Sequence, residues 1–387
     1  MRPSLPVLLL SLPLLFAAHA SAQDAAHLTI EQVMADPDWI GPPVERAWWA
    51  WDGQRVHYEL KREGSPIRDT YEQSTSGASA KRVGDGERAA LDAANPVYDA
   101  QRQRMAFVRN GDVFVRDLRN GALSQLTRSN DDEAQPRFTT DGGLSWRVGS
   151  QWYRATASGY VSQAAVLKAE KDPAAKPKPD ALREQQLRTI ETLARDRAQR
   201  DALQKQAEAW RKADPSRAAA PIYLGDEVEI IDSALSPDAR WMLVVTQKKG
   251  ADAGQAGKMP KYVTESGYEE FQEVRTRVGR NAPIAQALWL VDLAAGSARE
   301  LKFDALPGIK DDPLAAMRKA AGKDPLKGNR DVQVATRGDN GDASLLRWSD
   351  DGRNAVVMVR AIDNKDRWIA GVDLAGATLQ PRHRLTD

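Results

Sequence analysis

The stretch that decides the fold runs from Ser236 to Val245 and reads SPDARWMLVV. Its first half is typical of a tight turn, because Asp caps such a turn through the backbone and the following residue, usually Gly, accepts a positive φ. Its second half is a run of apolar, partly β-branched residues, which favours a β-strand. A turn that leads directly into a strand is therefore the candidate repeat unit of this sequence.

The same unit occurs four more times, each time as a small or aromatic residue, Asp, usually Gly or Ala, and then an apolar run. The other copies start at Trp51, Tyr98, Thr140 and Ser349. Asp52 and Asp99 are 47 residues apart, and Asp99 and Asp141 are 42 apart. That spacing is the period of a four-stranded propeller blade.

Hairpin signals follow the turn in three copies. Val113–Gly121, Leu288–Gly296 and Val372–Gly376 each lead from an apolar strand into Asn-Gly or Ala-Gly, which marks a β-hairpin. We therefore predict an all-β fold, a β-propeller of four-stranded antiparallel blades, about five of them recognisable and incomplete as a ring, with a helical insertion. A β-sandwich would also have short strands, but it would not repeat at about 45 residues.

Composition excludes several kinds of site and partner. The chain has 55 Lys and Arg against 54 Asp and Glu, four His and no Cys. A formal charge of +1 gives no field that would attract nucleic acid, and a chain without Cys forms neither disulfides nor thiolate metal sites. We therefore expect no cofactor, no metal site and no nucleic-acid partner.

The N-terminus has the features of a secretory signal over residues 1–22. Arg2 supplies the positive charge, Leu5–Ala18 the apolar stretch and Ala20–Ala22 the small-residue cleavage pattern. A membrane anchor is the alternative, but this stretch is shorter than the roughly 20 residues that span a bilayer. We expect residues 23–46 to form a lead segment and 47–387 the incomplete propeller. The protein would then be exported, periplasmic or secreted, with no membrane span after cleavage.

Two insertions interrupt the propeller repeats. Residues 168–215 form a charged insertion whose central part, Pro179–Lys212, is rich in good helix formers. Its interrupted apolar stripe, which includes Leu187, Ile190 and Trp210, is expected to pack on the propeller rim. Alternatively, it could bind a partner subunit, and so form a homo-oligomer. The second insertion, 248–283, is expected to be an extended loop or hairpin, and a further stretch, Asp304–Arg330, a long surface loop.

The repeats resemble a known propeller. Together with Arg275–Pro283 (RTRVGRNAP) and the strand Leu288–Leu293 (LWLVDL) that follows, they resemble the N-terminal β-propeller of the dipeptidyl peptidase IV branch of the prolyl oligopeptidase family. The resemblance covers about Ala47–Asp387. The individual turn–strand units are also similar to those of translocation-associated propellers of the TolB type.

The first resemblance implies the propeller portion of an exported serine peptidase, which gates the access of short peptides to a hydrolase domain. This chain has no Gly-x-Ser-x-Gly sequence, so we assign no catalytic residue and expect it to be inactive alone. The family holds the substrate N-terminus with a pair of acids, and Asp226–Glu227 or Glu269–Glu270 are the candidates here. The alternative function is that of a free-standing TolB-like propeller, a periplasmic scaffold that binds proteins.

Overall fold

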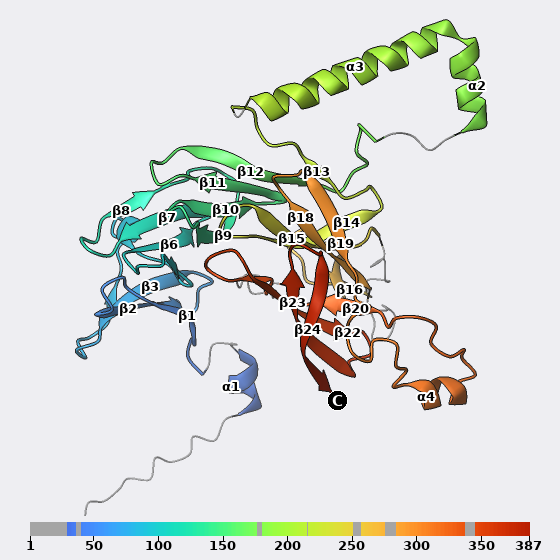
Figure 1. The fold of residues 1–387 in the computed structure, drawn as a ribbon. Helices are drawn as coiled ribbons and strands as arrows, with labels where there is room; N and C mark the ends of the chain where they lie inside the picture. The colour runs from blue at the N-terminus through green and yellow to red at the C-terminus, as the bar shows by residue number, and fades with distance from the viewer. Residues whose placement is uncertain are drawn as a thin grey trace, which may run out of the picture.

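The computed structural model describes residues 29–35, 40–175, 180–214, 216–250, 257–274, 284–336 and 345–387. Five antiparallel sheets follow one another along the chain (Figure 1). They are the blades of a β-propeller, which confirms the predicted fold. Residues 1–22 and Arg275–Pro283, on which the predicted signal and part of the resemblance depend, lie outside the described residues.

Each blade is built from consecutive strands, with a few additions. Blade 1 contains β1 (Val44–Trp49), β2 (Arg55–Lys61), β3 (Arg68–Ser74) and β4 (Lys81–Arg82). Blade 2 contains β5 (Val97–Tyr98), β6 (Arg104–Arg109), β7 (Asp112–Asp117) and β8 (Leu123–Gln125). Blade 3 contains β9 (Glu133–Phe138), β10 (Leu144–Val148), β11 (Gln151–Ala155), β12 (Val161–Lys168) and a short parallel strand, β13 (Ile222–Tyr223).

Blades 4 and 5 carry the longer interruptions. Blade 4 contains β14 (Val228–Leu235), β15 (Trp241–Lys248), β18 (Gln286–Asp292) and β19 (Ser297–Leu301). Blade 5 contains β20 (Val332–Val334), β21 (Arg347–Trp348), β22 (Ala355–Ala361), β23 (Asp366–Asp373) and β24 (Thr378–Thr386). Both β20 and β21 pair with β22, one at each end, so together they occupy the place of a single first strand.

The repeated turn joins the first and second strands of every blade, so each blade begins before its turn. Blade 1 thus starts at Val44, inside the expected lead segment, and blade 4 at Val228 rather than near Ser236. In the turn of blade 4, the N–H of Ala239 donates to the carbonyl of Ser236, and the Ser236 N–H donates to the carbonyl of Trp241. The Trp241 N–H in turn donates to the Ser236 hydroxyl, at 2.9 Å.

In blade 2, the turn is displaced by two residues from the position that the sequence repeat predicts. Its equivalent backbone bonds run from Arg102 to Asp99 and from Asp99 to Arg104. Asp99 therefore fills the place of Ser236, two residues before the turn Asp, and accepts hydrogen bonds from the N–H groups of Gln103 and Arg104 at 2.7 and 3.1 Å. An Asp can replace Ser because both supply an acceptor oxygen to the same backbone groups.

The hydrophobic core lies between successive blades, in four separate clusters. Strand β15 illustrates why: Met242 and Val244 pack toward blade 3, whereas Leu243 and Val245 pack toward blade 5. A strand covered on both faces needs apolar residues at consecutive positions instead of alternate ones. The inner blades therefore have continuous apolar runs, whereas β22 of blade 5 alternates buried and exposed residues.

The helical insertion stands off the blades (Figure 1). Helices α2 (Ala181–Thr189) and α3 (Glu191–Ala213) meet at Ile190, and neither contains a buried residue. The expectation that the apolar stripe packs on the propeller rim is wrong, since Ile190 and Trp210 are exposed. Helix α3 can remain helical without such packing because acidic residues precede basic residues by four positions along it.

The other connections are shorter. A hairpin of β16 (Gly257–Lys261) and β17 (Glu270–Val274) projects between β15 and β18. The remaining elements are α1 (Ile30–Ala35), the 3-10 turn η1 (Arg88–Ala90) and α4 (Ala315–Ala320). Among the described residues, no helix combines the length and the apolar composition needed to cross a membrane.

The stretch Asp304–Arg330 is more than the surface loop we expected. Leu306 and Ile309 are each only 2% exposed and belong to the core cluster between blades 4 and 5. Arg330 is also buried. The stretch therefore covers the edge of that core with a few buried residues, while most of its other residues, including most of those of α4, are exposed.

Candidate functional site

The two predicted acid pairs do not form a shielded site. Asp226 and Glu227 lie in the exposed turn between β13 and β14, where Asp226 pairs with Lys171 at 3.1 Å. Glu269 and Glu270 lie at the exposed tip of the β16–β17 hairpin. An ammonium group gains most from carboxylates that are partly shielded from water, and in the part of the chain that the structure describes all four acids are exposed.

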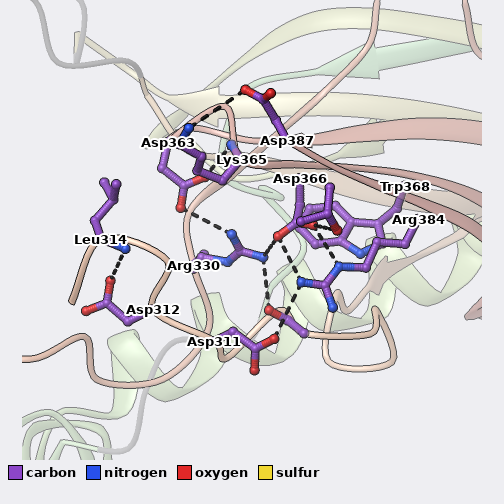
Figure 2. Close-up of polar contacts among 12 residues, drawn as sticks. Asp311, Asp312, Leu314, Arg330, Asp363, Lys365, Asp366, Trp368, Arg384 and Asp387 are labelled. Atoms are coloured by element: carbon purple, nitrogen blue, oxygen red, sulfur yellow. Dashed lines mark hydrogen bonds and ion pairs between the residues drawn. The ribbon is translucent and has the colours of Figure 1, made fainter. Parts of the chain in front are cut away.

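A buried charge cluster joins the Asp304–Arg330 stretch to blade 5 (Figure 2). Asp366, at the start of β23, accepts hydrogen bonds from Arg384 at 2.7 Å and from the Thr386 hydroxyl at 2.7 Å, and it pairs with Arg330. Burial would raise the pKa of Asp366, but the hydrogen bonds from Arg384, Thr386 and Arg330 outweigh burial and lower it. The carboxylate is therefore held ionised as an anchor.

The same cluster fixes the backbone of the Asp304–Arg330 stretch. Arg330 also donates to the carbonyl of Gly308 at 2.9 Å, and its guanidinium lies 5.3 Å from the centre of the Trp368 ring. The indole N–H of Trp368 donates to the carbonyl of Pro307 at 2.9 Å. These bonds tie the Asp304–Arg330 stretch to blade 5, so the role of the cluster is structural.

The strongest candidate for a ligand site is a cavity of about 310 Å³ between blades 1 and 2, which we call the inter-blade cavity. On one side, His57 of β2 and Glu72 of β3 are direct cross-strand partners. Glu72 Oε2 accepts hydrogen bonds from His57 Nε2 and from Arg55, both at 3.0 Å. His57 is only 2% exposed, and the Trp48 ring stacks on it at 5.8 Å.

The opposite side of the inter-blade cavity is a second buried ion pair. Asp92 precedes blade 2, and its carboxylate accepts hydrogen bonds from Arg116 Nε of β7 at 2.5 Å and from the N–H of Trp51 at 2.9 Å. Arg116 and Asp92 are 6% and 3% exposed. Lys81 and Glu87, paired at 2.8 Å, lie at the more exposed part of the lining. The lining therefore balances three cations with three carboxylates.

This arrangement can bind a ligand, but it lacks the groups for acyl transfer. Acyl transfer of the Ser-His type needs a serine hydroxyl within hydrogen-bond reach of a histidine. Here His57 Nε2 is hydrogen-bonded to Glu72, while Nδ1 is buried without a hydrogen-bond partner among the described residues. His383, on β24, is exposed. The described residues also contain no group of three His, Asp or Glu that could hold a metal ion.

Our sequence analysis did not select any residue of the inter-blade cavity as a site residue. A usable signal was present, because a hairpin turn centred on Gly64 and Ser65 places residues 57 and 72 opposite each other. Asp92 and Arg116, by contrast, come from different segments and meet only through the packing of blade 2. No local spacing could have paired them.

No family model and no curated protein matches the chain. Solved structures do resemble it. Among them, a putative dipeptidyl aminopeptidase IV from Bacteroides ovatus ATCC 8483 is 8% identical, with a TM-score of 0.35 over 88% of this chain and 37% of that one. Dipeptidyl peptidase 4 of Porphyromonas gingivalis is 11% identical, with a TM-score of 0.41 over 93% and 42%.

A putative TolB from Agrobacterium tumefaciens is 10% identical, with a TM-score of 0.24 over 66% of this chain and 63% of that one. The chain thus spans about two-fifths of the length of each of the two peptidases.

Proposed function

We propose that this chain is the non-catalytic propeller portion of an exported serine peptidase of the dipeptidyl peptidase IV type, which gates the access of short peptides to a hydrolase domain. The observation that carries the proposal is the place of the Leu288–Leu293 segment. Most of β18 lies within this segment, and β18 pairs with β15 and β19 in the middle of blade 4. In the family that the sequence resembles, a basic segment leads into such a strand within a blade.

The polar character of the inter-blade cavity agrees with a role in binding. Its charged side chains are paired with one another, and His57 Nε2 is bonded to a carboxylate instead of a nucleophile. The chain alone is therefore expected not to hydrolyse peptides. In this proposal, catalysis comes from the hydrolase domain and the propeller limits which peptides reach it.

The test is the size and reactivity of the protein in its own cells. Antibodies raised against residues 40–175 should detect an extracytoplasmic protein well above the 42.6 kDa of this chain, and a serine-directed fluorophosphonate should label the same band. The isolated chain should leave Ala-Pro and Gly-Pro chromogenic substrates intact. An unlabelled band no larger than this chain would instead favour the TolB-like scaffold. Exposed strands and the exposed helical insertion offer surfaces for protein binding in that case.

A further inference from the structure

Blade 5 carries a second cavity, of about 330 Å³, whose polar side chains are unlike those of the inter-blade cavity. Its charged lining consists of Arg360 and Arg367, and its other polar side chains are those of Gln286, Gln333 and Thr336. No acid is found among the described residues that line it, although acids and bases are almost equal in number in the whole chain. A cavity lined by cations and amides without a carboxylate favours an anion.

The two arginines are held side by side by the sheet. Arg360 on β22 and Arg367 on β23 are direct cross-strand partners. Like charges in that position destabilise a sheet. Arg360 donates to Gln333 Oε1 at 2.8 Å, whereas no described residue is hydrogen-bonded to or ion-paired with the Arg367 guanidinium. Both arginines are exposed residues, and among the described residues neither guanidinium is paired with a carboxylate.

The amides next to the arginines are fixed before any ligand arrives. Gln333 donates to the carbonyl of Ile284 at 3.2 Å, and Gln286 Oε1 accepts from the N–H of Val334 at 2.9 Å. These bonds tie the first strand of blade 5 to β18 of blade 4 and hold Gln333 where it orients Arg360. A preorganised donor loses less conformational entropy when it binds.

The remaining lining is apolar. Val334, Ala335 and Met358 border the cavity, and the Met358 side chain is 39% exposed. Inorganic anions gain nothing from such a surface, but the hydrocarbon part of an organic acid can pack against it. From the donor set and this apolar border, we propose that the blade 5 cavity is a binding site for an organic carboxylate, whose carboxylate lies between Arg360 and Arg367 and whose apolar chain contacts Met358.

The test is the binding of 4-methylvalerate to the purified chain. Ligand-observed NMR at constant ionic strength measures this binding. The neutral isostere 4-methylvaleramide and inorganic phosphate serve as comparison ligands. We expect saturable binding of the carboxylate, at least tenfold weaker binding of the amide, and weaker binding of phosphate. Charge-assisted hydrogen bonds to a guanidinium account for a difference of that size.

Arg367→Gln is the decisive variant, and Arg382→Gln is its matched control because Arg382 is an exposed arginine of the same blade that does not line the cavity. Arg367→Gln should weaken 4-methylvalerate binding at least tenfold without lowering the melting temperature of the ligand-free protein, since it removes a like-charge pair. Arg382→Gln should bind as the parent does. The proposal is overturned if no carboxylate binding saturates, if phosphate binds more tightly, or if both variants bind equally well.

Discussion

Ala239 occupies a backbone conformation that normally requires glycine. Its φ is +55°, and at the equivalent position of blade 5, Gly352 has a φ of +73°. An L-residue with a side chain pays roughly 1–2 kcal/mol for this conformation, which is partly offset by the greater entropy that Gly loses on folding. Ala239→Gly should therefore raise the free energy of unfolding by about 0.5–1 kcal/mol in urea denaturation.

The reverse exchange in blade 5 is the matched comparison. A Cβ added to Gly352 would lie 2.9 Å from Cγ of Asp238, so Gly352→Ala adds a steric conflict to the backbone strain. It should lower the free energy of unfolding by more than Ala239→Gly raises it. Equal and small effects of both substitutions would contradict this account of the turn.

Asp69 links stability to pH in blade 1. Its side chain is almost buried and accepts hydrogen bonds from Arg62 at 2.9 and 3.0 Å and from Arg82 at 2.9 Å. These bonds lower the pKa of Asp69 from 3.8 to about 2. Because the folded-state pKa lies below the unfolded one, the resulting stabilisation is present above pH 4 and is lost as the pH falls toward 2.

Asp69→Asn should accordingly be less stable than the parent at pH 6, and the difference should shrink as the pH falls from 4 to 2. Chemical denaturation at a series of pH values measures it. Glu63→Gln, an exposed acid of the same hairpin, is the control. A difference between parent and Asp69→Asn that is constant over this range would show that the ion pairs contribute nothing.

At the scale of single elements, α3 should be helical outside the protein. An acid precedes a base by four residues at four places in this helix: Glu191 and Arg195, Asp196 and Arg200, Asp201 and Lys205, and Glu208 and Lys212. Each such pair stabilises a helix by about 0.2–0.5 kcal/mol, and salt weakens it. A peptide of residues 190–213 should therefore show marked helicity by circular dichroism, lower in 1 M NaCl and lower when the four acids are replaced by amides. Helicity that is unaffected by salt and by the amide changes would disprove this explanation.

The elements also show what the sequence could and could not predict. The strands of β15 and β18 were predictable, because their apolar runs and flanking turns are local signals. The position of α3 was not, since a sparse apolar stripe is compatible with packing on a rim or with exposure. Leu306 and Ile309 flank Pro307 and Gly308 and belong to no periodic apolar run, so nothing local marked them as core. The two cavities differ in this respect: Arg360 and Arg367 face each other across one short hairpin, as His57 and Glu72 do, whereas Asp92 and Arg116 meet only through the packing of blade 2.

For the whole molecule, the division of the core into four clusters implies that stability is distributed along the chain. Each cluster joins one blade to the next, as in repeat proteins, whose stability is approximately a sum of intrinsic and nearest-neighbour terms. Between blades 4 and 5, the indole N–H of Trp348 donates to the carbonyl of Ala234 at 3.1 Å. Trp348→Phe removes this bond and should lower the stability of that interface by about 1–3 kcal/mol.

Hydrogen exchange measured by mass spectrometry can locate the effect. In Trp348→Phe, amides of β14, β15 and β22–β24 should exchange faster, whereas those of β2 and β6 should keep the parent rates, because the nearest-neighbour terms of blades 1 and 2 are unchanged. Met105→Ala, which empties part of the cluster between blades 1 and 2 where Met105 is 1% exposed, should give the opposite pattern. If either substitution accelerates exchange equally in all five blades, the blades unfold as one cooperative unit and the additive description fails.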